Sequence, residues 1–230
     1  MPPPPLPHHR MPPKMPTQET ILKLSRPILS PPRDPFRSTR LHYRALNPTT
    51  DLRLFAAING DPSGYANSNL SNIHLPTAAD AAQFQASVIE NSLVAAIICL
   101  PGGDDDADGG IAIGQIHLKR GKPGTQHHRN TEIGIDILPE YQRKGYGSEA
   151  IQWVLDYAFR RAGLHRVMIR AFGWNEGAIR LYEQLGFKHE ARHREALWHE
   201  GRWWDSIDMA MLEGESWEGK KNGVKDGIWG

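Results

Sequence analysis

A pair of glycines, Gly145 and Gly147, stands directly after two basic residues in the stretch QRKGYGS, and this spacing suits the binding of an anion. The stretch lies between a predicted strand and a predicted helix. The first backbone N–H groups of a helix have no partner inside it, and the helix dipole makes that end positive. Glycine lacks the β-carbon that would hold an anion away from these groups. Further donors and positive charge come from Gln142, Arg143 and Lys144, so the ligand that fits is a pyrophosphate.

Two better-known nucleotide-binding loops do not match this stretch. A Walker loop needs G-x-x-x-x-G-K-[ST], and a dinucleotide fingerprint needs a third glycine and a downstream acidic residue. Gly-x-Gly before a helix also occurs where a helix simply packs closely, and this alternative stays open on the stretch alone.

Periodicity predicts the elements that position this loop. Alternating or β-branched runs predict strands, and apolar residues three and four apart predict helices. The chain begins with a strand at 40–46, two helices at 49–60 and 76–91, and three strands at 92–100, 110–120 and 131–139. A helix at 147–163, a strand at 165–172, a helix at 175–186 and a closing hairpin at 190–212 follow. This order predicts a mixed α/β sheet flanked by helices.

Several element ends can also be predicted. Thr49 or Thr50 is the expected cap of the first helix, which should turn Ala56 inward together with larger apolar residues. Thr77 and Asp80 have the spacing of a capping box at the second helix. The closing hairpin should turn at about residues 200 and 201.

The two ends of the chain differ from the stretch between them. Residues 1–35 are rich in proline and predict a disordered arm, which is either a plain tail or a ligand for a proline-binding partner. Residues 214–230 are polar and glycine-rich and predict a flexible tail. The folded domain is therefore expected over 36–213.

Composition limits the possible function. The 230 residues carry 27 Lys and Arg against 26 Asp and Glu, a net charge of +1, so no overall field favours nucleic acid or an anionic membrane. The single cysteine, Cys99, lies in an apolar run and predicts a buried thiol in a reducing compartment. No run is long enough to span a bilayer. We expect a soluble, cytoplasmic protein, with a nuclear location still open.

Three motifs together resemble a known family. Gln142–Gly147 is similar to the [RQ]-x-x-G-x-[GA] acetyl-CoA loop of the GNAT N-acetyltransferases, EIGIDILPEY precedes it, and WNEGAIRLYEQLGF follows it. The branch that the chain resembles is that of ribosomal-protein-alanine and small-amine acetyltransferases. The resemblance covers about 40–212. It implies a mostly antiparallel sheet of six to seven strands with a splayed central strand pair, and acetyl-CoA as co-substrate without a metal.

The resemblance also implies roles for particular residues. In the family, the exposed backbone of the splayed strand binds the pantetheine arm, the glycine loop binds the pyrophosphate, and an asparagine caps the next helix or reaches the cofactor. The corresponding residues here are Ile137, Leu138, Gln142, Arg143, Lys144, Gly145, Tyr146, Gly147, Ser148 and Asn175. Tyr182 matches a tyrosine near the thioester sulfur, although it could simply continue the inward face of its helix.

Acetyl transfer from a thioester needs an acid and a base. An amine of pKa about 10 must lose a proton before it attacks. The departing thiolate needs a proton, for which we expect Tyr182. Glu132 is the first candidate for the base, although an ion-pair role fits it equally well. Asp136, Glu195 or a water are the alternatives.

The acceptor amine is not encoded in a recognisable way. Trp198, Trp203 and Trp204 in the closing hairpin could pack in the core or line the acceptor site, and the last two must face opposite sides of a strand. A small amine, a polyamine, a drug-like amine and a peptide N-terminus all remain open, as does a homodimer. A non-catalytic acyl-CoA-binding protein is the competing class. The acidic run 104–115 lacks the last ligand of a calcium loop, and His189 and His193 lie on a predicted strand, so neither predicts a metal site.

Overall fold

The computed structural model describes residues 34–102 and 110–215. The chain divides into two units, Met1–Pro35 and Phe36–Gly230, and the fold described below is that of the second. The predictions for the proline-rich arm, the acidic turn at 103–109 and the last fifteen or so residues fall outside the described residues.

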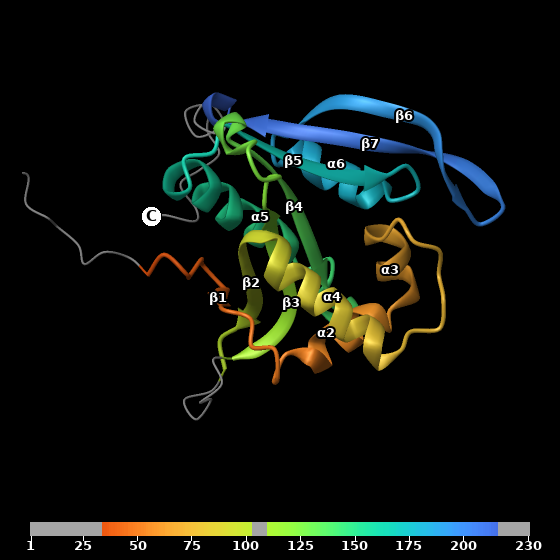
Figure 1. Cartoon of the computed structure of the whole chain (residues 1–230), viewed down its shortest axis with the longest axis horizontal. Coiled ribbons are helices and arrows are strands. Elements are labelled where there is room, and N and C mark those ends of the chain that lie inside the picture. Colours follow the sequence, from red (N-terminus) through yellow and green to blue (C-terminus); the bar gives the residue numbers. More distant parts are fainter. Residues whose placement is uncertain (1–33, 103–109, 216–230) are drawn as a thin grey trace, which may run out of the picture. The chain divides into compact units, whose positions relative to one another are not determined.

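A seven-stranded mixed sheet forms the centre of the domain (Figure 1). Its strand order is β1-β2-β3-β4-β5-β7-β6, and each neighbouring pair is antiparallel except β4 and β5, which are parallel. The strands are β1 His42–Arg44, β2 Ser92–Leu100, β3 Ile111–Lys119, β4 Asn130–Ile137, β5 Arg166–Phe172, β6 Lys188–His199 and β7 Arg202–Leu212. The predicted fold class is confirmed.

Helices cover both faces of this sheet. The helices are α2 Leu52–Asn59, α3 Pro62–Ser68, α4 Ala78–Asn91, α5 Tyr146–Asp156 and α6 Glu176–Gln184, with short turns at η1 Gln126–His128, η2 Pro139–Tyr141 and η3 Tyr157–Arg161. One core cluster joins the strands to α5 and α6, and a second joins them to α2 and α4. Ile133, Ile135 and Ile137 of β4 pack into the first cluster. Because strand side chains alternate, Glu132, Gly134 and Asp136 face the opposite side.

The central strands separate along their length. β4 and β5 pair only at their beginnings, from Asn130 opposite Arg166 to Glu132 opposite Met168. Beyond this point β4 continues to pair with β3 on its other side, up to Ile137 opposite Gly114. The parallel pair therefore opens into a V, as the resemblance predicted. An opened strand leaves backbone groups without a strand partner, and these groups can bind a ligand.

The predicted N-terminal caps of two helices can be compared with the structure. The capping box at Thr77 and Asp80 is confirmed, with both reciprocal hydrogen bonds present. The predicted cap of the first helix is wrong, because Asp51 takes the N-cap position instead of Thr49 or Thr50. Asp51 is buried and binds the Arg44 guanidinium at 2.6 Å, so a tertiary ion pair fixes where this helix begins.

Two further details differ from the prediction. Ala56 is exposed on α2, and the buried positions are Leu54, Phe55 and Ile58. The short helix α3 was not predicted, because its sequence PSGYANS contains weak helix formers. It is stabilised at its start by Pro62 and by the side chain of Asp61, which accepts a hydrogen bond from the Ser63 amide.

Candidate active site

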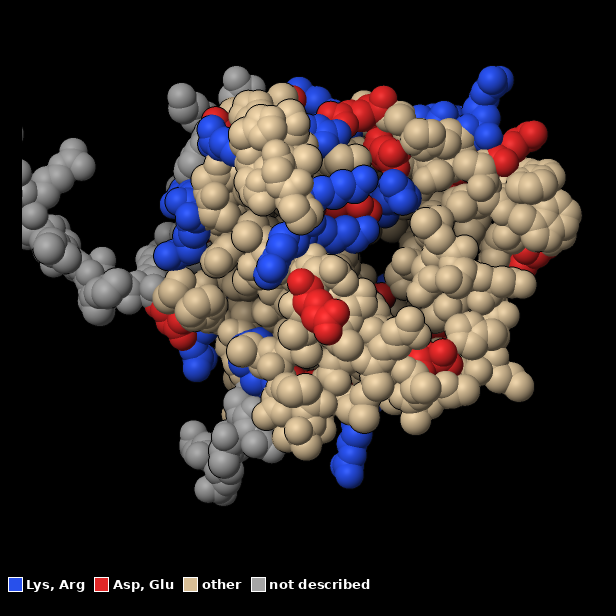
Figure 2. Space-filling model, viewed as in Figure 1, with Lys and Arg blue, Asp and Glu red and all other residues tan. Residues whose placement is uncertain are grey.

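A cavity of about 980 Å³ extends from the V between β4 and β5. Its walls come from β3, β4, β5, the loop before α5, and the helices α3, α4 and α6. Figure 2 shows a hollow on the face viewed, with Lys and Arg side chains gathered beside it. The glycine loop therefore borders the cavity on one side, and the separated strands β4 and β5 border it on another.

The glycine loop has an unusual backbone that presents its amides to the cavity. Arg143 has φ 56° and Gly145 has φ 83°, so the chain passes twice through the left-handed region just before α5. Such conformations in non-glycine residues are uncommon and often occur at functional sites. Residues 142, 143, 145, 147 and 148 line the cavity. The loop and the start of α5 therefore form a cradle of the kind that binds anions.

Two predicted loop residues have other contacts. The Lys144 ammonium lies 5.6 Å from the centre of the Tyr141 ring. The backbone carbonyl of Lys144 accepts a hydrogen bond from the Arg40 guanidinium at 2.9 Å. The Arg40 guanidinium lies over the ring of Tyr146 at 4.8 Å. Neither Lys144 nor Tyr146 lines the cavity, so any contribution of theirs to an anion comes from the backbone.

A buried carboxylate fixes the start of α5 beneath this loop. Glu149 accepts hydrogen bonds from the backbone and guanidinium of Arg40 and from the Ser38 hydroxyl, each at 2.7 Å. Burial by itself would raise the pKa of Glu149, but these hydrogen bonds outweigh it and hold the pKa below its ordinary value. The loop thus packs on a charged cluster whose carboxylate already has its hydrogen-bond partners inside the protein.

The two glycines of the loop differ in their surroundings. A β-carbon at Gly147 would meet no atom within 4 Å, so the protein itself does not fill this position. A β-carbon at Gly145 would lie 3.1 Å from the Arg40 guanidinium, which together with its positive φ explains that glycine structurally. Packing therefore does not account for Gly147, and the approach of an anion there stays a prediction.

The splayed strand meets the loop at Ile137 and Leu138. The Leu138 amide donates to the Ile113 carbonyl at 2.9 Å, and its own carbonyl accepts from the Tyr141 amide at 2.9 Å. The Ile137 carbonyl accepts from the Gln142 side chain at 2.8 Å. Both backbone groups of Leu138 are thus used inside the protein. By the alternation of an antiparallel ladder, the groups directed into the V belong to the Ile137 amide and to Ile135, and the expected contact at Leu138 stays a prediction.

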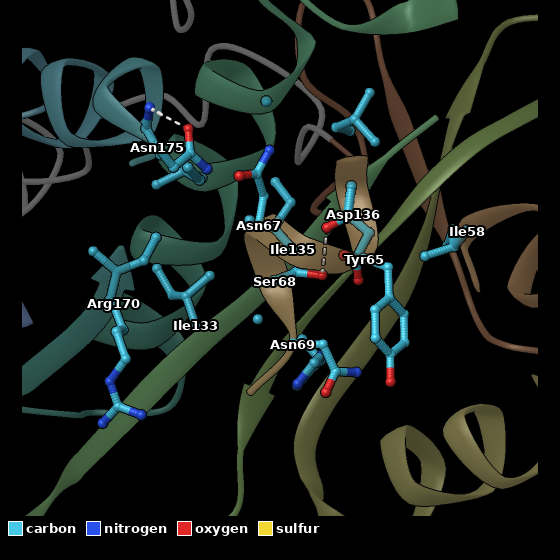
Figure 3. A pocket seen from close by; sticks show the side chains of 18 of the residues that line it. Ile58, Tyr65, Asn67, Ser68, Asn69, Ile133, Ile135, Asp136, Arg170 and Asn175 are labelled. Carbon is cyan, nitrogen blue, oxygen red and sulfur yellow. Dashed lines mark hydrogen bonds between the residues drawn. The ribbon is translucent and has the colours of Figure 1, made fainter. Parts of the chain in front are cut away.

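Tyr182 and Asn175 both border the cavity from α6. Tyr182 is buried within the inward face of its helix, and burial together with the nearby charge of Asp136 raises the pKa of its phenol far above the ordinary value. The phenol therefore stays protonated and can act as a donor. The Asn175 side chain caps α6 by accepting from the Ala178 amide at 3.2 Å, which leaves its NH₂ group for other contacts (Figure 3).

Three carboxylates were candidates for the base, and the structure separates them. Glu132 lines the cavity but pairs with the Lys119 ammonium at 3.0 Å. Asp136 also lines the cavity, and burial raises its pKa, offset in part by hydrogen bonds from Gln115 and Ser68 (Figure 3). Glu195 is exposed on the β6–β7 hairpin and does not line the cavity.

Sequence reasoning missed two polar residues on β3. Gln115 is fully buried, and its amide nitrogen donates to Asp136 at 2.7 Å. His117 lines the cavity, and burial, with a smaller contribution from Lys119, lowers its pKa to about 4. The signal was present, because Gln115, His117 and Lys119 alternate on one face of an apolar strand.

The tryptophans of the closing hairpin lie outside the cavity lining. Trp203 and Trp204 face opposite sides, as predicted: Trp203 is 56% exposed, whereas Trp204 packs edge-on against Trp174. Trp198 is also exposed and contacts Trp203. For Trp198 and Trp203, the predicted core packing is therefore wrong, and a role at the acceptor site stays a prediction.

The comparison with known proteins identifies the family. A sequence model described as "Acetyltransferase (GNAT) domain" matches residues 40–188. The chain belongs to the GNAT acetyltransferase family. This match contains the glycine loop, the splayed strand and Tyr182.

Relatives of this GNAT chain are recognised over part of their length. The uncharacterized N-acetyltransferase YnaD of Bacillus subtilis is 36% identical over 86 residues, which is 37% of this chain and 50% of YnaD. The spermidine N(1)-acetyltransferase of Vibrio cholerae is 36% identical over 86 residues, again 37% of this chain and 50% of that enzyme. The chain thus spans about half the length of the curated relatives it matches.

Solved GNAT structures agree over a longer stretch. The spermidine N-acetyltransferase of Vibrio cholerae, solved in complex with CoA and spermine, superimposes with a TM-score of 0.64 at 25% identity, covering 77% of this chain and 98% of that one. Within 34–102 and 110–215, no group of three or more potential ligand side chains is arranged to hold a metal ion. Over the same ranges no helix has the length and apolar character that crossing a bilayer needs.

Proposed function

We propose that this protein transfers the acetyl group of acetyl-CoA to a primary amine by direct attack in a ternary complex. The observation that carries this proposal is the single cavity that joins the glycine loop, the opened β4 strand and Tyr182. Family membership supports the same reaction class. We assign each part of the cavity to one part of the co-substrate.

The residues fit the co-substrate from its diphosphate to its thioester. The amides of 143–148, with the Arg143 side chain and the second N–H of the Gln142 side chain, would bind the pyrophosphate. The Ser148 hydroxyl donates to the Gly145 carbonyl at 2.8 Å, so Ser148 would contribute its amide. The Ile137 amide and the backbone of Ile135 would bind the pantetheine arm as an added strand binds a sheet edge. In this binding mode the thioester would lie between the separated ends of β4 and β5. The NH₂ group of Asn175 is a further donor at the same opening.

The acid and the base lie on opposite faces of the sheet. Asp136 faces the α2–α4 side of β4, whereas Tyr182 comes from α6 on the other side. In the reaction, the amine nitrogen bonds to the acetyl carbonyl carbon and the carbon–sulfur bond breaks. The proton that leaves the amine goes to Asp136, and Tyr182 gives a proton to the thiolate. Backbone amides of the opened strand would stabilise the oxyanion that forms between these steps.

We assign the base to Asp136 ahead of Glu132 because of their surroundings. The pKa of Asp136 is raised by burial, and a raised pKa brings a carboxylate closer to the working range of a general base. Glu132 pairs with the Lys119 ammonium at 3.0 Å, so its carboxylate already has a cationic partner inside the protein.

A pair of variants separates these two candidates. Asp136→Asn should lower kcat roughly 100-fold to 10,000-fold, the usual contribution of a general base, while leaving acetyl-CoA affinity unchanged. Glu132→Gln serves as the matched control and should cost much less. A large loss in the second variant with little loss in the first would exchange their roles.

The charge of the cavity favours an acceptor with a single ammonium group. Three acidic residues line it: Asp61 caps α3, Glu132 is paired with Lys119, and Asp136 has no cationic partner among the described residues. A polyamine would bring more than one positive charge into a cavity that Lys119, Arg143, Arg170 and Arg180 also line, and buried charges without partners are costly. We therefore expect monoamines to be better acceptors than spermidine, although spermidine is the named substrate of some relatives.

Turnover against a panel of amines tests the proposed function. Release of the CoA thiol should rise on addition of at least one monoamine, and mass spectrometry should find that amine acetylated. The competing class, a protein that binds acyl-CoA without catalysis, predicts binding of acetyl-CoA without thiol release for any member of the panel. Binding alone does not separate the two classes, so the acetylated product is the deciding result.

A further inference from the structure

A buried amide side chain connects a histidine to the proposed base. Gln115 is 0% exposed, and its Nε2 donates to Asp136 Oδ2 at 2.7 Å. Its Oε1 lies 2.9 Å from Nδ1 of His117. Both ends of the amide are therefore occupied, as expected for a polar group in the interior.

The hydrogen bonds fix where the protons lie. An amide nitrogen that donates to Asp136 leaves the amide oxygen facing His117, and an oxygen can only accept. His117 must therefore carry its proton on Nδ1. The low pKa of His117, about 4, keeps the ring neutral over the pH range of most assays, so the second nitrogen, Nε2, has a lone pair and this arrangement persists.

Close packing holds the imidazole in place. His117 lies opposite Gly134 in the β3–β4 pair. A β-carbon at position 134 would be 2.2 Å from Cε1 of His117, so the absence of a side chain on β4 makes room for the ring. The ring can therefore lie across β4 and reach Gln115 on its own strand.

The orientation of the Gln115 amide decides the state of Asp136. A reversed amide would have almost the same shape, so packing alone selects neither orientation. In the reversed state the oxygen would face Asp136, which favours the protonated acid, and a protonated acid cannot accept the proton of the amine. The Nδ1–H group of His117 favours the orientation with the oxygen toward the ring, and the ionised Asp136 favours the same orientation from the other end of the amide.

We infer that His117 is a positioning residue: it orients the Gln115 amide so that its NH₂ group faces Asp136 and keeps this carboxylate ready to accept a proton. The inference rests on the proposed function, because it takes Asp136 as the base. Ser68 of α3 gives the same carboxylate a second hydrogen bond (Figure 3). The other ionisable or charged side chains that line the cavity come from α3 and its flank, β3, β4, β5, the loop and α6: Asp61, Tyr65, Lys119, Glu132, Arg143, Arg170, Arg180 and Tyr182.

Two substitutions at position 117 test this role. His117→Asn keeps an N–H donor at the place of Nδ1, whereas His117→Gln moves the donor one bond further, to the place of Nε2. The measurement is the pH dependence of kcat/KM, together with the melting temperature. Because catalysis needs deprotonated Asp136, kcat/KM falls as the pH falls through the pKa of this residue. A weaker hydrogen bond raises that pKa, so His117→Gln should move the acid limb upward by roughly 1 pH unit, and His117→Asn should leave it near that of the unaltered protein.

Each outcome of this comparison is decisive. Unchanged profiles in both variants, or equal shifts in both, would overturn the positioning role. If both position-117 variants fail to fold, Gln115→Met removes the donor at similar volume and should give the same upward shift; an unchanged profile would overturn the role. Nitrogen NMR of the folded protein is a readout that needs no activity: it should find Nδ1 of His117 protonated and Nε2 unprotonated, and the opposite tautomer would refute the inference. Absence of turnover in the unaltered protein would instead count against the proposed function.

Discussion

Gly147→Val is the sharpest perturbation of the proposed pyrophosphate site. Gly147 lies in the first turn of α5, its β-carbon would meet nothing within 4 Å, and it lines the cavity. The β-carbon of a new side chain would therefore stand in the cavity without touching an atom outside its own helix turn. Valine is also a slightly better helix former than glycine, by about 0.3 kcal/mol. The fold should consequently be as stable as before.

The effect on binding can be sized from the contacts that would be lost. Each hydrogen bond to a charged group contributes about 1.5–3 kcal/mol. Blocking the anion from two amides would cost about 3–6 kcal/mol, which is roughly a 100-fold to 10,000-fold loss of affinity. Calorimetry with CoA and acetyl-CoA measures this loss, and a thermal melt without ligand shows that the fold is intact.

Two companion variants make the result interpretable. Gly147→Ala adds one methyl group to the cradle and should give an intermediate loss of affinity. Gly145→Ala acts on the backbone instead, because its φ of 83° costs a residue with a β-carbon about 1–2 kcal/mol of stability. Unchanged CoA affinity in a folded Gly147→Val protein would refute the assignment of this loop to the pyrophosphate.

Three further predictions concern other parts of the site. Tyr182→Phe should leave acetyl-CoA affinity near normal and slow turnover, measured as thiol release. Equal turnover rates in the variant and the unaltered protein would show that the phenol does not act in the reaction. Glu149→Gln should destabilise the domain by about 1–2 kcal/mol at neutral pH. Folding lowers the pKa of Glu149, so its carboxylate stabilises the fold fully above the pKa of an unfolded glutamate, about 4.3, and this stabilisation is lost as the pH falls through the lower folded value. The free energies of unfolding of the two proteins, measured in urea, should therefore converge in acid. A difference that stays constant with pH would contradict this. Trp174→Phe removes the indole hydrogen bond of 3.0 Å to Asn67, which ties α3 to the β5–α6 connection, and should raise KM for the amine without changing that for acetyl-CoA; the reverse pattern would place the acceptor elsewhere.

Features written in neighbouring residues could be predicted from the sequence. The capping box at Thr77 and Asp80 and the hairpin turn at Glu200 and Gly201 depend on spacing alone, and both are present. The cap of α2 could not be predicted in the same way. Asp51 takes that position because Arg44, seven residues earlier, pairs with it in the folded chain.

The glycine loop was predictable and the proton chemistry was not. Charge and glycine spacing within 142–148 are local, whereas the contact of Gln115 with Asp136 depends on the register of β3 against β4. Side-chain alternation shows which residues share a face, but it does not fix which residue of one strand lies opposite which residue of the next. The helix α3, which contributes Ser68 to the same carboxylate, is formed mainly through its cap and its tertiary contacts.

A crystal structure with bound CoA tests the central claim most directly. The account predicts the diphosphate against the amides of 143–148, the pantetheine arm along Ile135 and Ile137 in the opening between β4 and β5, and the sulfur close to the hydroxyl of Tyr182. A structure with the diphosphate away from this loop, or with the pantetheine arm outside the V, would contradict it.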